Sequence, residues 1–308
     1  MGKTAILFAG QGAQYPGMGR ALYESSPAAR AVFDMAEGIR PGTCGQCFEG
    51  TAAELAVTAN TQPCLFTVDL ACGEALREAG VPLEAAAGFS LGELAALAFS
   101  GMLTREQAFR LVCRRAALMQ SCAEETEGAM AAVLKLPFAR VEELCESFDK
   151  VYPVNYNCPG QLVVAAAAGQ LDGFAAAVKA AGGKCVPLAV SGAFHSPFMA
   201  RASAQMAEEL QGVTYRAGSM PVYANLTGKP YEGDFAGLTA RQIQSPVQWA
   251  ATLQNLRAAG FDTFVEAGPG KTLCGLVKKT LPDAVACRVE DTETLAQTLQ
   301  TIKGGCAC

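Results

Sequence analysis

The sequence predicts an α/β protein built around a mostly parallel sheet, with a small subdomain inserted into it. Short apolar segments alternate with segments of helical periodicity before residue 126 and again after residue 192, which is the rhythm of βαβ units. Between these parts the order changes to strand, helix, two strands, helix and strand, which is the ferredoxin-like order. We therefore expect a discontinuous larger unit, residues 1–126 and 192–308, and an inserted smaller unit, residues 127–191.

The larger unit is expected to alternate strands and helices on both sides of the insertion. Its strands are short apolar runs, beginning with the run that follows Lys3, and its helices have apolar residues every three or four positions. The expected strands cover residues 4–8, 85–88, 222–225, 263–266 and 285–289, and the expected helices cover 28–39, 63–79, 91–100, 105–122, 249–259, 272–280 and 292–302.

The inserted unit is expected to contain four strands and two helices. Its two middle strands are joined by Cys158-Pro159-Gly160, residue types that form tight turns. The expected strands cover residues 129–136, 152–157, 161–167 and 185–190, and the expected helices cover 139–148 and 171–181.

Composition excludes several classes of protein. The chain has 308 residues, of which 51% are hydrophobic, so it can bury enough apolar surface to fold. Its net charge of −5 gives no general attraction to nucleic acid or to an anionic membrane surface. The most apolar stretch, residues 85–103, contains Glu93 and three glycines, which indicates buried core and not a membrane span. We expect a cytoplasmic protein, because the apolar run after Lys3 is too short for a signal peptide and the thirteen cysteines are scattered and odd in number.

Neither a metal nor a nucleotide cofactor is expected. Cys44-x-x-Cys47 has no second pair of ligands at the spacing of a zinc site. Gly10-x-Gly12 follows a strand, but Tyr15 occupies the third glycine position of a dinucleotide fingerprint. Gly270-Lys271-Thr272 ends like a phosphate-binding loop, but Val265 stands where the first glycine of that loop belongs.

The segment Gly88-Phe89-Ser90-Leu91-Gly92 matches the G-x-S-x-G nucleophile elbow and lies between an expected strand and helix. A serine at such a sharp turn presents its hydroxyl, and the glycines leave room for the close approach of the backbone. The next backbone N–H can then stabilise an oxyanion at the positive end of the helix. A structural glycine-rich turn is the alternative interpretation.

His195 is the only histidine of the chain, so it is the one imidazole that could activate Ser90. It lies where the inserted unit returns to the larger one, a position suited to a cleft between them. The alternative is a structural histidine.

Arg115 falls on the apolar stripe of the helix expected at 105–122, whereas Arg110 and Arg114 do not. Its neighbours one turn away include no carboxylate. A buried guanidinium stays charged and requires an anionic partner. Spacing alone leaves two partners open, a distant Asp or Glu or the carboxylate of a substrate.

The chain resembles malonyl-CoA:acyl carrier protein transacylases over nearly its whole length. The resemblance rests on several motifs in the order and at the spacing of that family. They are residues 8–14, Thr61-Gln62-Pro63, residues 88–93, Arg115 with Met119-Gln120, residues 157–161, Gly192-Ala193-Phe194-His195, Gln242 with Ser245-Pro246-Val247, and residues 266–270.

The resemblance implies a fold, an activity and a set of residue roles. It implies an α/β-hydrolase-like core with a ferredoxin-like insertion, and transfer of malonyl from malonyl-CoA to acyl carrier protein through a malonyl-serine intermediate, without a cofactor. Ser90 would be the nucleophile and His195 its base, oriented by a main-chain carbonyl at Gln242. The backbone N–H groups of Leu91 and Gln11 would form the oxyanion hole, and Arg115 would bind the malonyl carboxylate.

Two aromatic residues concern specificity. The family usually has His just before the nucleophile, where this chain has Phe89, so any hydrogen bond from that position to the acyl group is missing. Phe194 matches a bulky residue that is associated with malonyl rather than α-methylated units in related acyltransferases, because its ring would leave little room for a methyl group.

Three other functions remain as alternatives. An acyltransferase of a polyketide assembly line would use the same site with another carrier protein. A thioesterase or lipase-like hydrolase would use the same elbow, although hydrolysis of neutral acyl chains needs no buried cation. A non-catalytic binding module would need neither Ser90 nor His195.

For the oligomeric state, we expect a monomer.

Overall fold

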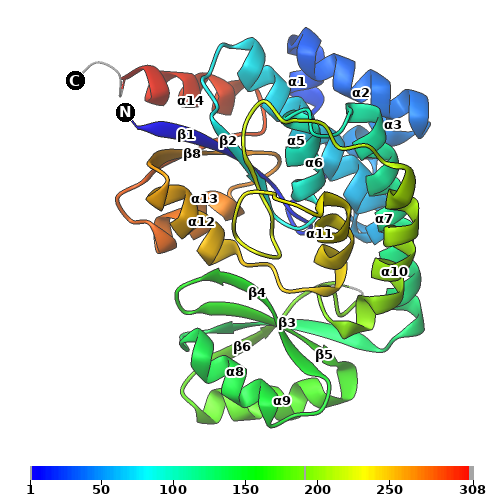
Figure 1. Ribbon diagram of the computed structural model, residues 1–308, viewed down its shortest axis with the longest axis vertical. Helices are drawn as coiled ribbons and strands as arrows, with labels where there is room; N and C mark the ends of the chain where they lie inside the picture. The colour runs from blue at the N-terminus through cyan, green and yellow to red at the C-terminus, as the bar shows by residue number, and fades with distance from the viewer. Residues whose placement is uncertain (1, 191, 305–308) are drawn as a thin grey trace.

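The computed structural model describes residues 2–190 and 192–304 and contains two sheets (Figure 1). The larger sheet has the strand order β7-β2-β1-β8-β9, and its neighbouring strands are all parallel. The smaller sheet is antiparallel with the order β4-β5-β3-β6. These findings confirm the expected α/β class, with a parallel main sheet and a ferredoxin-like insertion. The expected boundary between residues 191 and 192 stays a prediction, and Ser191 itself lies outside the described residues.

The larger sheet is apolar on both faces because helices cover both of them. In β1, Ile6 and Phe8 pack into one hydrophobic core, and Ala5 and Leu7, which alternate with them, pack into another. The strands of this sheet are β1 (Lys3–Phe8), β2 (Ala85–Gly88), β7 (Val222–Tyr223), β8 (Phe261–Ala267) and β9 (Val285–Val289).

Different helices cover the two faces (Figure 1). One core contains side chains of α5 (Thr58–Glu78), α6 (Gly92–Phe99) and α7 (Arg105–Glu125), whereas the other contains side chains of α12 (Trp249–Ala258) and α13 (Thr272–Thr280). The remaining α-helices of this part are α1 (Arg20–Ser25), α2 (Pro27–Ile39), α3 (Thr43–Glu49), α4 (Ala52–Ala56), α10 (Ala200–Glu209), α11 (Phe235–Arg241) and α14 (Thr292–Gly304).

The smaller sheet places its two faces in different surroundings. Val133 and Val164 pack under its own two helices, whereas Met130 and Val163 join the core of the larger part. The chain also links the two parts through Val247, whose N–H donates to the Val154 carbonyl and whose carbonyl accepts from the Tyr156 N–H. The elements are β3 (Gly128–Leu134), α8 (Phe138–Glu146), β4 (Val151–Cys158), β5 (Gln161–Ala167), α9 (Ala168–Ala180) and β6 (Lys184–Pro187).

Several expected boundaries were wrong. Helix α5 begins at Thr58, five residues before the expected start at Pro63, and Pro63 lies inside it. Burial explains this outcome, because most side chains of α5 are buried and their packing outweighs the hydrogen bond that the proline cannot donate. Strands β6 and β7 are shorter than expected, ending at Pro187 and Tyr223.

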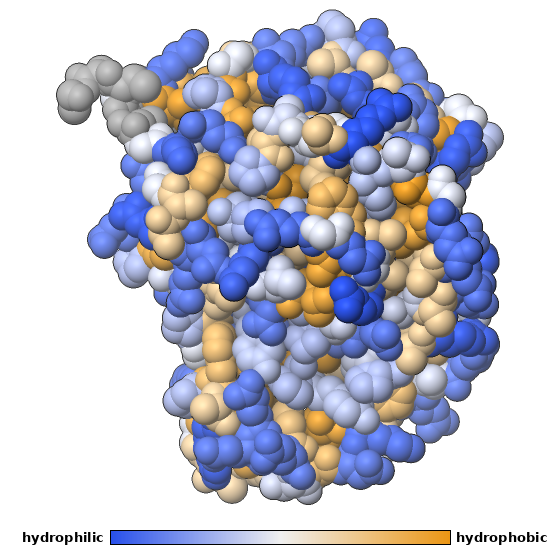
Figure 2. Space-filling model, viewed as in Figure 1, coloured by the Kyte–Doolittle hydropathy of each residue, from blue (hydrophilic) through white to orange (hydrophobic). Residues whose placement is uncertain are grey.

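The surface of the face shown in Figure 2 is mixed in character. Hydrophilic side chains are spread over both parts of the molecule, and apolar side chains are exposed between them in separate patches (Figure 2). Within the described ranges, none of the helices combines the length and the apolar character required to cross a bilayer.

Candidate active site

Ser90 lies in the sharp turn between the end of β2 at Gly88 and the start of α6 at Gly92. Its φ of 55° is in the left-handed region, which is costly for a residue other than glycine. The flanking glycines are required by close backbone contacts. A Cβ at Gly88 would lie 1.9 Å from the carbonyl carbon of Gly92, and a Cβ at Gly92 would lie 2.5 Å from the carbonyl oxygen of Phe8.

We expect Gly88→Ala to lower the free energy of unfolding by about 3 kcal/mol or more, because backbone atoms would have to move to admit the methyl group. Chemical denaturation of the purified protein measures this change. Gly169→Ala is the matched control, since a Cβ at Gly169 in α9 meets no atom within 4 Å. Equal stability of the two variants would contradict the packing described for the elbow.

His195 is in hydrogen-bond contact with Ser90. Its Nε2 lies 2.7 Å from the Ser90 Oγ, and its Nδ1 lies 2.9 Å from the main-chain oxygen of Gln242. A carbonyl can only accept, so Nδ1 carries the proton and Nε2 is free to accept the serine proton. His195 also has a positive φ of 60°. The structure thus brings the only imidazole to the Ser90 hydroxyl in the tautomer that a general base needs.

The environment of His195 keeps its imidazole neutral. Burial and the nearby positive charge of Arg115 lower the pKa of His195 to about 4. The pKa of His195 in the folded protein thus lies below its ordinary value of 6.5. The contribution of His195 to the free energy of unfolding is therefore fully present above pH 6.5 and is lost as the pH falls toward 4.

Because the chain has one histidine, nitrogen NMR of protein without a histidine tag reports His195 directly. We expect the shifts of a neutral, Nδ1-protonated ring to persist from pH 8 down to about pH 5, following the low pKa of the buried group. Arg115→Gln should raise the pKa, because it removes the charge that disfavours imidazolium. A titration midpoint near 6.5 in the unaltered protein would contradict this description of the site.

Arg115 reaches the same point from α7, where it is only 2% exposed. Its Nη2 donates to the Ser90 Oγ at 3.1 Å and to Gln242 Oε1 at 2.9 Å, and its Nη1 donates to Gln62 Oε1 at 2.7 Å. Burial lowers the pKa of Arg115 to about 10, so it remains charged near neutral pH.

All three hydrogen-bond partners of Arg115 are neutral oxygens. Among the described residues no carboxylate forms an ion pair with it. Of the two partners that the sequence left open, a protein carboxylate is thus not found in contact. Glu93 acts on the guanidinium only from a distance, and a ligand carboxylate next to Ser90 would supply a negative charge in direct contact with it.

The backbone N–H groups of Leu91 and Gln11 remain free to stabilise an oxyanion. Neither donates a hydrogen bond to any described residue, although neighbouring amides of the elbow, those of Gly92 and Glu93, are paired with Phe89 and Ser90 carbonyls. Gln11 lies in the loop after β1, and its side chain is held by the Thr58 hydroxyl at 3.2 Å. Two unpaired amides near a nucleophile are the requirement of an oxyanion hole.

A cavity of about 80 Å³ adjoins Ser90 and His195. It continues into a wider cleft of about 200 Å³, because Gln11, Phe89, Asn155 and Leu188 line both spaces. Asn155 and Asn157 line the wider cleft, and the buried Oδ1 of each has no hydrogen-bond partner among the described residues.

Two aromatic rings shape these spaces. Phe89 packs edge-on against Trp249, with ring centroids 5.3 Å apart, and lines both spaces with an apolar surface. Phe194 lines the cavity next to Ser90 and is 6% exposed. Both side chains therefore limit the volume that is open to a bound group, and neither can form a hydrogen bond with it.

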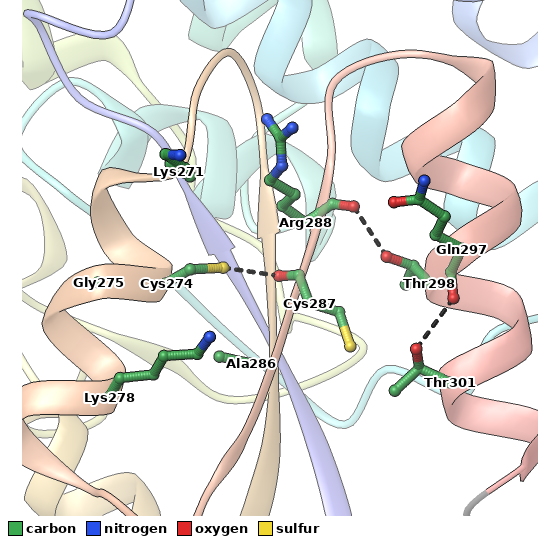
Figure 3. Close-up of a pocket in the computed structure, with 10 residues that line it drawn as sticks. All are labelled: Lys271, Cys274, Gly275, Lys278, Ala286, Cys287, Arg288, Gln297, Thr298 and Thr301. Atoms are coloured by element: carbon green, nitrogen blue, oxygen red, sulfur yellow. Dashed lines mark hydrogen bonds between the residues drawn. The ribbon is translucent and has the colours of Figure 1, made fainter.

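A larger hollow of about 450 Å³ lies elsewhere, between α13, β9 and α14 (Figure 3). Its lining includes Lys271, Lys278 and Arg288, but none of the residues that the sequence singled out as catalytic or substrate-binding. The Cys274 thiol donates to the Cys287 carbonyl at 3.0 Å, and burial raises the pKa of both thiols. They are therefore poor nucleophiles.

Comparison with known proteins shows the family of the chain. The family described as "Acyl transferase domain" matches residues 6–300. The chain belongs to this acyl transferase family.

Several relatives in the acyl transferase family are named malonyl CoA-acyl carrier protein transacylases. The malonyl CoA-acyl carrier protein transacylase of Bacillus subtilis (strain 168) is 37% identical over 311 residues, covering 98% of both chains. The solved transacylase of Clostridium perfringens superposes with a TM-score of 0.95 at 32% identity over 98% of both chains. A malonyl-transacylase in complex with a type II PKS acyl-carrier protein superposes with a TM-score of 0.93 at 32% identity, covering 97% of this chain and 99% of that one.

The sequence did not identify every residue that this acyl transferase places around Ser90. Gln62 was noted only as part of a motif, yet it holds Arg115. Asn225 was expected as the last residue of a strand, whereas it lies after β7 and its side chain contacts the elbow. No periodicity identifies such residues, because Gln62 contacts Arg115 across 53 residues of the chain and Asn225 contacts Ser90 across 135.

Proposed function

We propose that the chain is a malonyl-CoA:acyl carrier protein transacylase in which Ser90 carries the malonyl group between the two thiols. The observation that carries this proposal is the position of Arg115, a buried cation without an acidic partner among the described residues, 3.1 Å from the Ser90 Oγ. A malonyl ester on that oxygen would bring its free carboxylate to the guanidinium. The names of the relatives support the same substrate.

The first half of the reaction forms the ester. The Ser90 hydroxyl transfers its proton to His195 Nε2 as its oxygen attacks the thioester carbon of malonyl-CoA. The negative charge that develops on the carbonyl oxygen is stabilised by the N–H groups of Leu91 and Gln11, each worth about 3 kcal/mol of barrier in comparable sites. The carbon–sulfur bond then breaks, and imidazolium protonates the departing sulfur of coenzyme A.

The second half reverses these steps with a different thiol. The phosphopantetheine thiol of acyl carrier protein gives its proton to His195 and attacks the ester, and Ser90 Oγ recovers that proton as it leaves. The wider cleft suits the pantetheine arm, because polar side chains, those of Asn155 and Asn157, line it and the arm carries amide groups. Two acyl carriers with the same arm can thus use one cleft in turn.

Phe89 and Phe194 suit a small acyl group bound through its carboxylate. A phenyl ring at position 89 donates no hydrogen bond, so the acyl carboxylate depends on Arg115. Phe194 beside the 80 Å³ cavity leaves little volume for an α-methyl group. Malonyl is therefore favoured over methylmalonyl and over neutral acyl chains.

A hydrolase is the candidate from another class, and release of coenzyme A distinguishes it. With malonyl-CoA alone we expect a burst equal to the enzyme concentration and then little further release. Sustained release should require carrier protein bearing phosphopantetheine, and carrier protein without that group is the control. Steady formation of free malonate without any carrier would instead show a thioesterase. Separate assays with fatty-acid and polyketide carrier proteins test which pathway the enzyme serves.

A further inference from the structure

Asn225 is a fully buried residue whose side chain contacts the nucleophile elbow from the neighbouring edge of the sheet. It lies two residues after β7, the strand that pairs with β2. Its Oδ1 accepts the backbone N–H of Ser90 at 2.7 Å, and its Nδ2 donates to the Gly88 carbonyl at 2.7 Å. One carboxamide therefore holds backbone groups on both sides of Phe89.

Ser90 needs such support because of its backbone conformation. A non-glycine residue in the left-handed region costs about 1–2 kcal/mol and persists only where its surroundings impose it. Asn225 fixes the N–H of Ser90, and Gln242 Nε2 fixes its carbonyl at 2.7 Å. Gln242 Nε2 also lies 3.3 Å from Asn225 Oδ1, so the two carboxamides contact each other.

Asn225 is itself fixed by Glu93, which lies in the first turn of α6, the helix that follows the elbow. The Asn225 N–H donates to Glu93 Oε2 at 2.5 Å, and the Tyr231 hydroxyl donates to the other oxygen of the same carboxylate. Burial raises the pKa of Glu93 to about 7. A closed ring of covalent and hydrogen bonds thus joins the elbow, α6, Glu93 and Asn225. This ring leaves the side-chain carboxamide of Asn225 a single orientation.

We propose that Asn225 is a positioning residue for acyl transfer, holding Ser90 in the left-handed conformation that presents its hydroxyl to His195. Asn225 forms its hydrogen bond with the backbone N–H of Ser90 and not with the reacting Oγ. It therefore acts through the conformation of Ser90. Loss of its side chain leaves the Ser90 N–H and the Gly88 carbonyl buried and unpaired. The turn can then relax. The serine hydroxyl no longer points to His195, and the Leu91 N–H no longer points to the place where the oxyanion forms.

The test compares Asn225→Ala with Asn255→Ala. Asn255 is the matched control, because its Nδ2 also donates to a backbone carbonyl, that of Gly228 at 2.8 Å, in the turn that follows Asn225, but it does not touch the elbow. The rate of Ser90 modification by a fluorophosphonate, mapped by peptide mass spectrometry, reports the nucleophile without any acyl substrate. The steady-state constants for malonyl-CoA and the melting temperature are measured beside it.

We expect Asn225→Ala to slow fluorophosphonate labelling of Ser90 by about 100-fold, in line with the loss of a group that aligns a nucleophile. In transfer assays kcat should fall by a similar factor with KM within about threefold, because the substrate contacts remain. Asn255→Ala should stay within about threefold in both assays even where its melting temperature falls equally. Labelling of Asn225→Ala at the unaltered rate, or equal slowing in both variants, would overturn the proposal.

A second variant keeps the test decisive if Asn225→Ala does not fold. Asn225→Asp preserves shape and the acceptor for the Ser90 N–H, but its carboxylate cannot donate to the Gly88 carbonyl. Labelling slowed at least about tenfold supports a clamp on both sides of the elbow, and an unchanged rate overturns it. The kcat measurement rests on the proposed transferase function. Labelling does not, so an enzyme inert toward malonyl-CoA whose serine still reacts would contradict only that function.

Discussion

His195→Ala should slow malonylation of Ser90 by about 10³- to 10⁴-fold, the upper part of the usual contribution of a positioned general base. The effect should be this large because the chain has no second histidine and the Nε2 of His195 lies 2.7 Å from the serine oxygen. Rapid-quench measurement of the acyl-enzyme, with malonyl-CoA in excess, gives the rate of this step.

Added imidazole provides the control for His195→Ala. The alanine leaves a space beside Ser90 that a free imidazole can enter, so part of the lost rate should return with imidazole concentration. The unaltered enzyme should not respond. A variant that forms the acyl-enzyme within tenfold of the normal rate would show that His195 is not the base.

Arg115→Ala should reduce malonyl transfer by about 10²- to 10³-fold, because a buried carboxylate that loses a charged partner is destabilised by several kcal/mol. Acetyl transfer should fall much less, since an acetyl group has no carboxylate for Arg115 to bind. The quantity to compare is the ratio of kcat/KM for malonyl-CoA and acetyl-CoA.

Arg114→Ala is the matched control for Arg115→Ala. Arg114 is the preceding residue of α7, but it is exposed and pairs with Glu209 at 2.7 Å. Its replacement should leave the malonyl-to-acetyl ratio unchanged. Equal losses for the two acyl groups in Arg115→Ala would mean that this residue supports the site through Ser90, Gln62 and Gln242 and does not select the substrate.

Much of the fold could be predicted from local pattern. β2, β5, α13 and β9 have the expected bounds, because apolar runs and helical periodicity mark buried elements directly. The short helices α1, α3, α4 and α11 and the longer α10 were not predicted. The order of strands in the larger sheet was not predicted either, because it depends on which distant segments pair.

The residues of the candidate site also fall into those that local pattern predicted and those that it did not. Ser90 was recognised from a local motif, His195 from being the only imidazole, and Arg115 from its place on an apolar stripe. Gln62 and Asn225 were missed because their importance arises from contacts with residues 53 and 135 positions away. Local signals thus identify groups that react, whereas the residues that hold them are visible only once the chain is folded.

The most direct measurement of the central claim is intact-protein and peptide mass spectrometry after brief mixing with malonyl-CoA. We predict one added malonyl group, located on Ser90 and removed again when carrier protein bearing a free phosphopantetheine thiol is supplied. Ser90→Ala should show no adduct. An unmodified Ser90, or a malonyl group on another residue that passes to the carrier at the same rate, would contradict the account.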